Sequence, residues 1–196
     1  MNKLETIIDT EWLTSKSACK DGAQWLKENT GIGATAGDIL RDTLEKYQPD
    51  YFRWLASQLM DKMECMEWSI FCAEQVIGIF ESKFPNDDRP RKAIDAAKNY
   101  LANPNAANAY YVVNAAYAGY ADAAAAAAYA AASYAAASYA SYASYASYAS
   151  YASYAYYAAT SAAAASAANA CADLSAKRKM IKICSEKALE ILGRDL

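Results

Sequence analysis

The sequence predicts an all-α protein, a multi-helix bundle, and three observations lead to this prediction. Between residues 50 and 83, apolar side chains recur every three or four positions, the spacing of one face of a helix. Residues 106–170 consist almost wholly of Ala, Tyr and Ser, and Ala is the strongest helix former. After Pro104 the chain contains no further proline, so signals that break helices are scarce in its second half.

Short helices separated by turn signals are expected in the first part of the chain. Residues 4–13 are expected to form a short amphipathic segment. Ser15 or Ser17 is expected to cap the helix that follows it. Residues 31–37, Gly-Ile-Gly-Ala-Thr-Ala-Gly, are predicted to be a flexible connection. They are not predicted to cradle a phosphate, because no strand precedes them and no Lys-Ser/Thr pair follows. Another helix is expected over residues 38–47.

The longest helix of the first half is predicted over residues 50–83, with Pro49 at its start. Its apolar side chains form two flanks, which indicates that other elements pack on both sides. One flank consists of Phe52, Leu55, Leu59, Met63, Met66, Ile70, Ile77 and Phe80, and the other of Trp54, Trp68, Phe71 and Val76.

Two further helices have clear sequence signals at their ends. Residues 85–88, Pro-Asn-Asp-Asp, break the chain, and Asp88 is expected to cap a helix over residues 89–101. The last helix is predicted over residues 174–192, where Gly193 stops it.

The Ala/Tyr/Ser-rich tract, residues 106–170, holds fourteen of the seventeen tyrosines. Its centre repeats the triplet Ser-Tyr-Ala, and each three-residue step turns a helix by ~300°, so the repeated tyrosines follow a spiral. They are Tyr139, Tyr142, Tyr145, Tyr148, Tyr151 and Tyr154. We expect two or three helices here, folded onto each other or onto the first half. The predicted regions are residues 1–103, which are helical, and residues 104–196, with the tract and the last helix, packed together as one domain.

Other conformations of the tract are open at this point. A three-residue β-solenoid or a polyproline-like coil is disfavoured by the high Ala content and the shortage of Gly and Pro. An ice-binding helix would need small hydroxyls on one face, which the spiral does not provide. A disordered low-complexity segment is the remaining alternative.

The composition of the chain argues against several kinds of catalysis, metal site and binding partner. No histidine occurs, which removes Ser-His-Asp and Cys-His catalysis, and the usual zinc ligand sets, so we expect no enzyme activity, cofactor or metal. The net charge of −3 argues against nucleic acid as the main partner. Five cysteines with no close pair suggest reduced thiols in a cytoplasm. No apolar run suits a signal peptide or a membrane span, so a cytoplasmic protein with no membrane contact is expected.

One cluster of charges is a candidate pocket or structural ion pair. Glu74 lies on an otherwise apolar helix, and we expect it to pair with Arg89 or Arg91 after the chain turns at Pro85. A two-carboxylate site formed by Glu67 and Glu74, which share a helix face, is the less favoured alternative.

Several short motifs resemble one known family. They are Trp68, Cys72-Ala73-Glu74 and Val76, then Phe80-Glu81, then Pro85-x-Asp87-x-Arg89-Pro90-Arg91-x-Ala93-Ile94, followed by an Ala-rich tail studded with Tyr and Asn. Together they resemble the Imm-5-like immunity proteins, a family of helical proteins in bacteria and their phages. The resemblance implies a cytoplasmic protein that binds and neutralises a toxin.

The main functional hypothesis is an immunity-like or antitoxin-like protein that masks a partner protein stoichiometrically. Tyr supplies large, rigid contact area at low entropic cost, so the six repeated tyrosines are the candidate binding surface. Inhibition of a host defence protein by a phage protein would give the same sequence pattern. The alternatives are a small-molecule or nucleotide-binding bundle around Glu74, Arg89 and Arg91, and a self-assembling structural protein; the sequence leaves homo-oligomers open.

Overall fold

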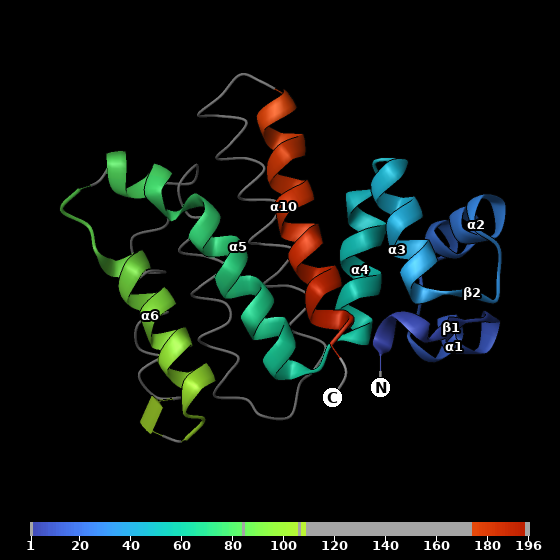
Figure 1. Ribbon diagram of the computed structural model, residues 1–196, viewed down its shortest axis with the longest axis horizontal. Helices are drawn as coiled ribbons and strands as arrows, with labels where there is room; N and C mark the ends of the chain where they lie inside the picture. Colours follow the sequence, from blue (N-terminus) through green and yellow to red (C-terminus); the bar gives the residue numbers. More distant parts are fainter. Residues whose placement is uncertain (1, 84, 106, 109–173, 195–196) are drawn as a thin grey trace. The chain divides into compact units, whose positions relative to one another are not determined.

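The computed structural model describes residues 2–83, 85–105, 107–108 and 174–194 (Figure 1). The chain divides into two compact units, Met1–Met60 with Ser185–Leu196, and Asp61–Cys184. The described residues form α-helices, one short 3-10 helix and one two-stranded sheet, so the predicted all-α class is confirmed. The Ala/Tyr/Ser-rich tract, with its expected helices, lies outside the described residues except for residues 107–108. The predicted regions 1–103 and 104–196 stay a prediction.

The first unit contains the N-terminal elements. They are the 3-10 helix η1 (Lys3–Glu5), β1 (Ile7–Ile8), α1 (Thr10–Ser15), α2 (Lys20–Asn29), β2 (Ala34–Thr35), α3 (Ala36–Glu45) and α4 (Pro49–Leu59). Residues 185–192, the last part of α10 (Leu174–Leu192), also belong to this unit. Its core is built from the side chains of Ile8, Leu13, Leu26, Ile39, Leu40, Phe52, Leu55, Ile191 and Leu192.

A small antiparallel sheet corrects the prediction of a flexible connection at residues 31–37. Ile7 lies opposite Thr35, and Ile8 lies opposite Ala34. Gly31 and Gly33 have φ angles of +97° and +91°, so the chain turns through a conformation that glycine adopts without steric cost. Thr35 then caps α3, because its side chain accepts a hydrogen bond from the backbone N–H of Asp38 at 3.2 Å.

The helix α2 begins later than expected, because Cys19 takes the capping position in place of Ser15 or Ser17. The Cys19 Sγ accepts a hydrogen bond from the backbone N–H of Gly22 at 3.3 Å. Ser15 ends α1, and Ser17 has a φ of 54°, a conformation outside the extended region that a capping residue usually adopts.

Aromatic rings join α4 to the two helices near the N-terminus within the first unit. Trp54 meets Trp12 of α1 edge to face, with ring centroids 6.1 Å apart, and Tyr51 meets Trp25 of α2 at 5.4 Å. All four side chains are half-buried. Such pairs add about 0.5–1.5 kcal/mol each beyond the area that they bury, so they help to hold α1 and α2 on α4.

The second unit contains α5 (Lys62–Lys83), α6 (Arg89–Ala102) and the part of α10 up to Cys184. The single helix expected over residues 50–83 is wrong, since the chain leaves the helical conformation at Met60, with φ −74° and ψ 144°. A reciprocal cap starts the next helix. The Asp61 carboxylate accepts hydrogen bonds from the N–H groups of Met63 and Glu64, and the Glu64 carboxylate accepts one from the N–H of Asp61.

The last two predicted helices are confirmed almost to the residue. α6 begins at Arg89 after Asp88, and α10 covers the whole of residues 174–192. The Asp88 carboxylate makes no capping hydrogen bond and instead pairs with Lys92, one turn along α6, at 2.9 Å. The buried side chains of this unit are Cys65, Met66, Trp68, Ile70, Cys72, Ala73, Ile77, Ile94, Ala97 and Cys184.

Candidate functional site

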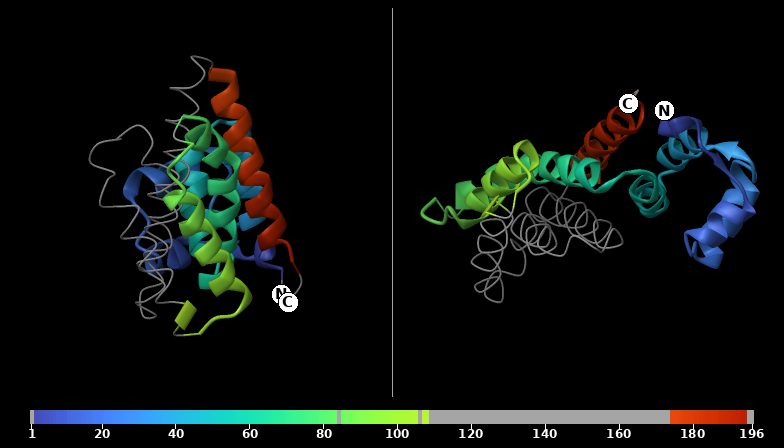
Figure 2. Two further views of the ribbon diagram at one scale, coloured as in Figure 1. Left: turned by 90° about the vertical axis from the view of Figure 1, so that its left-hand side faces the viewer. Right: turned by 90° about the horizontal axis from the view of Figure 1, so that it is seen from below.

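The helices α5 and α6 form an antiparallel hairpin, and they lie side by side in both Figure 1 and Figure 2. Among the side chains that the structure describes, the ion pairs Glu81–Arg91 and Glu74–Lys98 cross from one helix to the other. Glu81 and Arg91 lie five residues on either side of Asn86, and Glu74 and Lys98 lie twelve residues on either side of it. Asn86, in the turn, is therefore the midpoint about which the two helices face each other.

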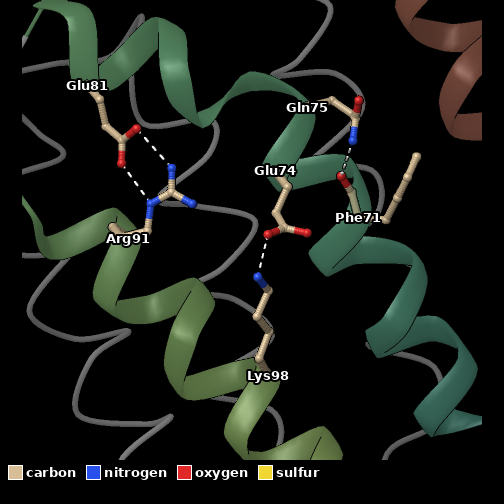
Figure 3. A network of polar contacts seen from close by, with 6 residues as sticks. All are labelled: Phe71, Glu74, Gln75, Glu81, Arg91 and Lys98. Atoms are coloured by element: carbon tan, nitrogen blue, oxygen red, sulfur yellow. Dashed lines mark hydrogen bonds and ion pairs between the residues drawn. The ribbon is translucent and has the colours of Figure 1, made fainter.

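The Arg91 guanidinium binds both carboxylate oxygens of Glu81 (Figure 3). Its Nε donates to Oε1 at 2.7 Å, and its second terminal nitrogen donates to Oε2 at 2.9 Å. The hydrogen bonds from Arg91 lower the pKa of Glu81 below its usual value, and the positive charge adds to this effect. The same hydrogen bonding raises the pKa of Arg91, with smaller contributions from the charges of Asp95 and Glu74.

The second ion pair lies further from the turn. The Lys98 ammonium donates a hydrogen bond to the Glu74 carboxylate, and the side chains of Lys98 and Glu74 are 44% and 33% exposed (Figure 3). Next to Glu74, the Gln75 side chain donates to the Phe71 carbonyl at 3.3 Å. Surface pairs of this kind contribute little energy each, but two of them fix the register of the hairpin.

The sequence predicts that Glu74 pairs with Arg89 or Arg91, but among the described side chains Glu74 and Arg91 each pair with a different residue. Glu74 meets Lys98, Arg91 meets Glu81, and the side chain of Arg89 lies outside the described residues. Lys98 is not among the residues singled out from the sequence, and Glu81 is named there only as part of a family motif. Each lies as far from the midpoint of the turn as its partner, Arg91 or Glu74, does on the other helix. Residues at equal distances from the midpoint of an antiparallel helix pair face each other, so this spacing is a sequence signal that identifies them.

A second cluster joins α5 to α10 inside the second unit. The indole N–H of Trp68 donates to the backbone carbonyl of Cys184 at 2.7 Å, and all of the Trp68 side chain is buried. One turn further along α5, the side chain of Cys72 is a neighbour of the Cys184 side chain. Burial raises the pKa of Cys72 well above its usual value, and Cys184 raises it further.

The six repeated tyrosines proposed as a binding surface, Tyr139, Tyr142, Tyr145, Tyr148, Tyr151 and Tyr154, lie outside the described residues. Within the part of the chain that is described, no group of three or more Cys, Asp or Glu side chains could hold a metal ion. No helix among the same residues has both the length and the hydropathy needed to cross a membrane.

Comparison with known families gives a match. A family model described as "Imm-5 like putative immunity protein" matches residues 56–186, which include α5, α6 and most of α10 as well as the tract. Comparison with curated proteins and with solved structures gives no significant match. Because the family model covers well over half of the sequence, the chain belongs to the Imm-5-like family of immunity proteins.

Proposed function

We propose that this chain is a non-enzymatic, cytoplasmic protein that binds a toxin-like partner protein and neutralises it by stoichiometric masking. Family membership over residues 56–186 carries the proposal, because the family's description is that of an immunity protein, and such a protein acts through a protein partner. The partner of this chain is a toxin or, in a phage, a defence effector of the host.

The composition of the tract supports a protein partner and indicates where contact is made. Tyr, Ser and Ala dominate residues 106–170, and a tyrosine ring brings a large apolar surface and one hydroxyl while losing only two side-chain rotations. We assign partner contact to the six repeated tyrosines, Tyr139, Tyr142, Tyr145, Tyr148, Tyr151 and Tyr154. Tyrosine is among the residues that most often dominate binding energy at protein interfaces.

The charges of the hairpin favour a protein partner over a small anionic ligand. Arg91 is occupied by Glu81 and Lys98 by Glu74, so an anion would have to displace a carboxylate at either position. The two pairs suit a structural role, because they orient α5 and α6 and present no uncompensated positive charge.

A titration tests stoichiometric masking directly. The full chain is added to the purified partner protein that it captures from host cells, and the residual activity of that partner is measured against the molar ratio. We expect activity to fall linearly to an end point at one equivalent, with a complex of matching mass in solution. Full inactivation by a small fraction of an equivalent would indicate catalysis, and the absence of a complex would exclude masking; either result overturns the proposal.

Matched variants test the role of the tyrosines. Replacing the six tyrosines by Ala should weaken binding by at least roughly tenfold, since hot-spot aromatic rings are lost. Replacing the same six by Phe keeps the ring area and should weaken binding less. A control with Ser141→Ala, Ser144→Ala and Ser147→Ala changes the same triplets without touching a ring and should leave affinity unchanged. A folded chain lacking residues 106–170 that binds the toxin as tightly as the full chain would exclude the tract as the contact surface.

A further inference from the structure

Two buried thiols from distant parts of the sequence meet inside the second unit. Cys72 on α5 and Cys184 on α10 are 0% and 1% exposed, and their side chains are neighbours. An independent contact fixes the same juxtaposition, since Trp68, one turn before Cys72, donates its indole N–H to the Cys184 carbonyl at 2.7 Å. The two sulfur atoms are therefore held together by the packing of α5 against this part of α10.

We propose that Cys72 and Cys184 are a latent disulfide pair, which a small-molecule disulfide such as oxidised glutathione converts into a cross-link between α5 and α10. One cysteine thiolate attacks the glutathione disulfide and releases one glutathione thiol. The second cysteine then displaces the other glutathione and forms the Cys72–Cys184 bond. The protein gives up two hydrogen atoms in total, and the oxidised glutathione takes them up as two thiols.

Helix geometry excludes a disulfide between Cys72 and the other buried thiol on α5. Cys65 is also buried, at 2% exposed, and lies seven residues before Cys72 on the same helix. Seven residues advance a helix by ~10 Å, beyond the ~7 Å between Cα atoms that a disulfide can span. Cys72 and Cys184 are neighbours on two packed helices, so a disulfide between them needs less movement of the backbone than one between Cys72 and Cys65.

Burial determines how such a pair responds to its surroundings. Neither thiol is accessible to an oxidant until α10 opens locally from α5, so oxidation of the folded chain is expected to be slow. The raised pKa of Cys72 slows it further, because only the thiolate attacks. Once formed, the disulfide resists reduction, since the buried site does not stabilise the thiolates that reduction would produce.

The test uses the full chain with Cys19→Ser and Cys171→Ser, which removes the exposed thiol and the one cysteine outside the described residues. The protein is unfolded and refolded in oxidised glutathione, so that burial presents no barrier, and its disulfides are mapped by mass spectrometry of peptides. We expect one cross-linked peptide pair, Cys72 with Cys184, with Cys65 left as a thiol. A chain that refolds with Cys72 and Cys184 still reduced, or with either joined to Cys65, overturns the proposal.

Two comparisons complete the test. In the same background, Cys65→Ser should keep the cross-link, whereas Cys72→Ser should abolish it. The oxidised protein should unfold several degrees higher than the reduced protein, because the bond closes the long loop between the two cysteines, and a reductant should reverse the shift. A cross-linked protein whose unfolding midpoint equals that of the reduced protein would overturn the claim that the bond ties α5 to α10.

Discussion

Arg91 holds both carboxylate oxygens of Glu81, at 2.7 and 2.9 Å, across the turn that joins α5 to α6. The planar guanidinium matches the carboxylate in a way that a lysine ammonium does not. The Arg91 and Glu81 side chains are 37% and 38% exposed, however, so water screens their attraction. The ion pair is therefore expected to stabilise the fold by no more than a well-aligned pair on a protein surface does.

A double-mutant cycle should measure this pair. With Arg91→Ala, Glu81→Ala and the double variant, we expect a coupling energy of about 0.5–1 kcal/mol in urea unfolding followed by circular dichroism. Arg91→Lys keeps the charge but loses the bidentate geometry, so it should retain less than the full coupling. A coupling energy indistinguishable from zero would mean that the bidentate contact does not hold the hairpin in solution.

Acidification should remove the contribution of Glu81. Its pKa is lowered in the folded chain, so the ion pair stabilises the fold fully above the usual pKa of a glutamate. That contribution is lost as the pH falls through the lowered, folded-state pKa. The difference in unfolding free energy between the wild type and Glu81→Gln should therefore be largest near neutral pH and should vanish at strongly acidic pH. A difference that grows on acidification would contradict the assignment.

Asp61 should matter for stability through its cap on α5. Asp61→Ala removes the acceptor for the N–H groups of Met63 and Glu64, and we expect a loss of about 1 kcal/mol in unfolding free energy. Asp61→Asn keeps an acceptor oxygen and serves as the matched control, with a smaller loss. If the Ala and Asn variants are equally stable, the side chain does not cap the helix.

The fluorescence of Trp68 should be quenched less by acrylamide than that of the other tryptophans. Trp68 is fully buried, whereas Trp12, Trp25 and Trp54 are half-buried, so a variant that retains only Trp68 should show the weakest quenching of fluorescence by acrylamide. Trp68→Phe leaves the Cys184 carbonyl without its indole donor and should cost about 1–3 kcal/mol. A variant that retains only Trp12 supplies the half-buried reference, and equal quenching of the two would contradict the burial of Trp68.

The sequence signals that succeeded are local ones. The limits of α6 and α10 follow from Pro90 in a first turn, from the apolar spacing and from Gly193 after the last turn. The break between α4 and α5 was missed, because apolar spacing continues through Met60. The pattern Asp61-x-x-Glu64 is a capping signal, which could have marked the start of a new helix.

Contacts between residues far apart in the chain could not be predicted from local sequence patterns. Strands of two residues, Ile7–Ile8 and Ala34–Thr35, are too short to show an alternating pattern. The contact between Cys72 and Cys184 joins residues far apart in the chain, and nothing in their local sequence predicts it. The partner of Glu74 is set by the register of the whole hairpin, so it follows from the sequence only once the midpoint of the turn is known.

The position of Asn86 at the midpoint of the hairpin has a consequence for how this protein can evolve. Residues 85–88 form a turn and are not helical, so a residue added there can be absorbed by a longer loop while the charges of α5 and α6 still face each other. The composition of the turn is constrained at Asp88, which pairs with Lys92. Descendants of this gene should therefore tolerate a change in the length of the turn more readily than a change in the spacing of the paired charges within either helix.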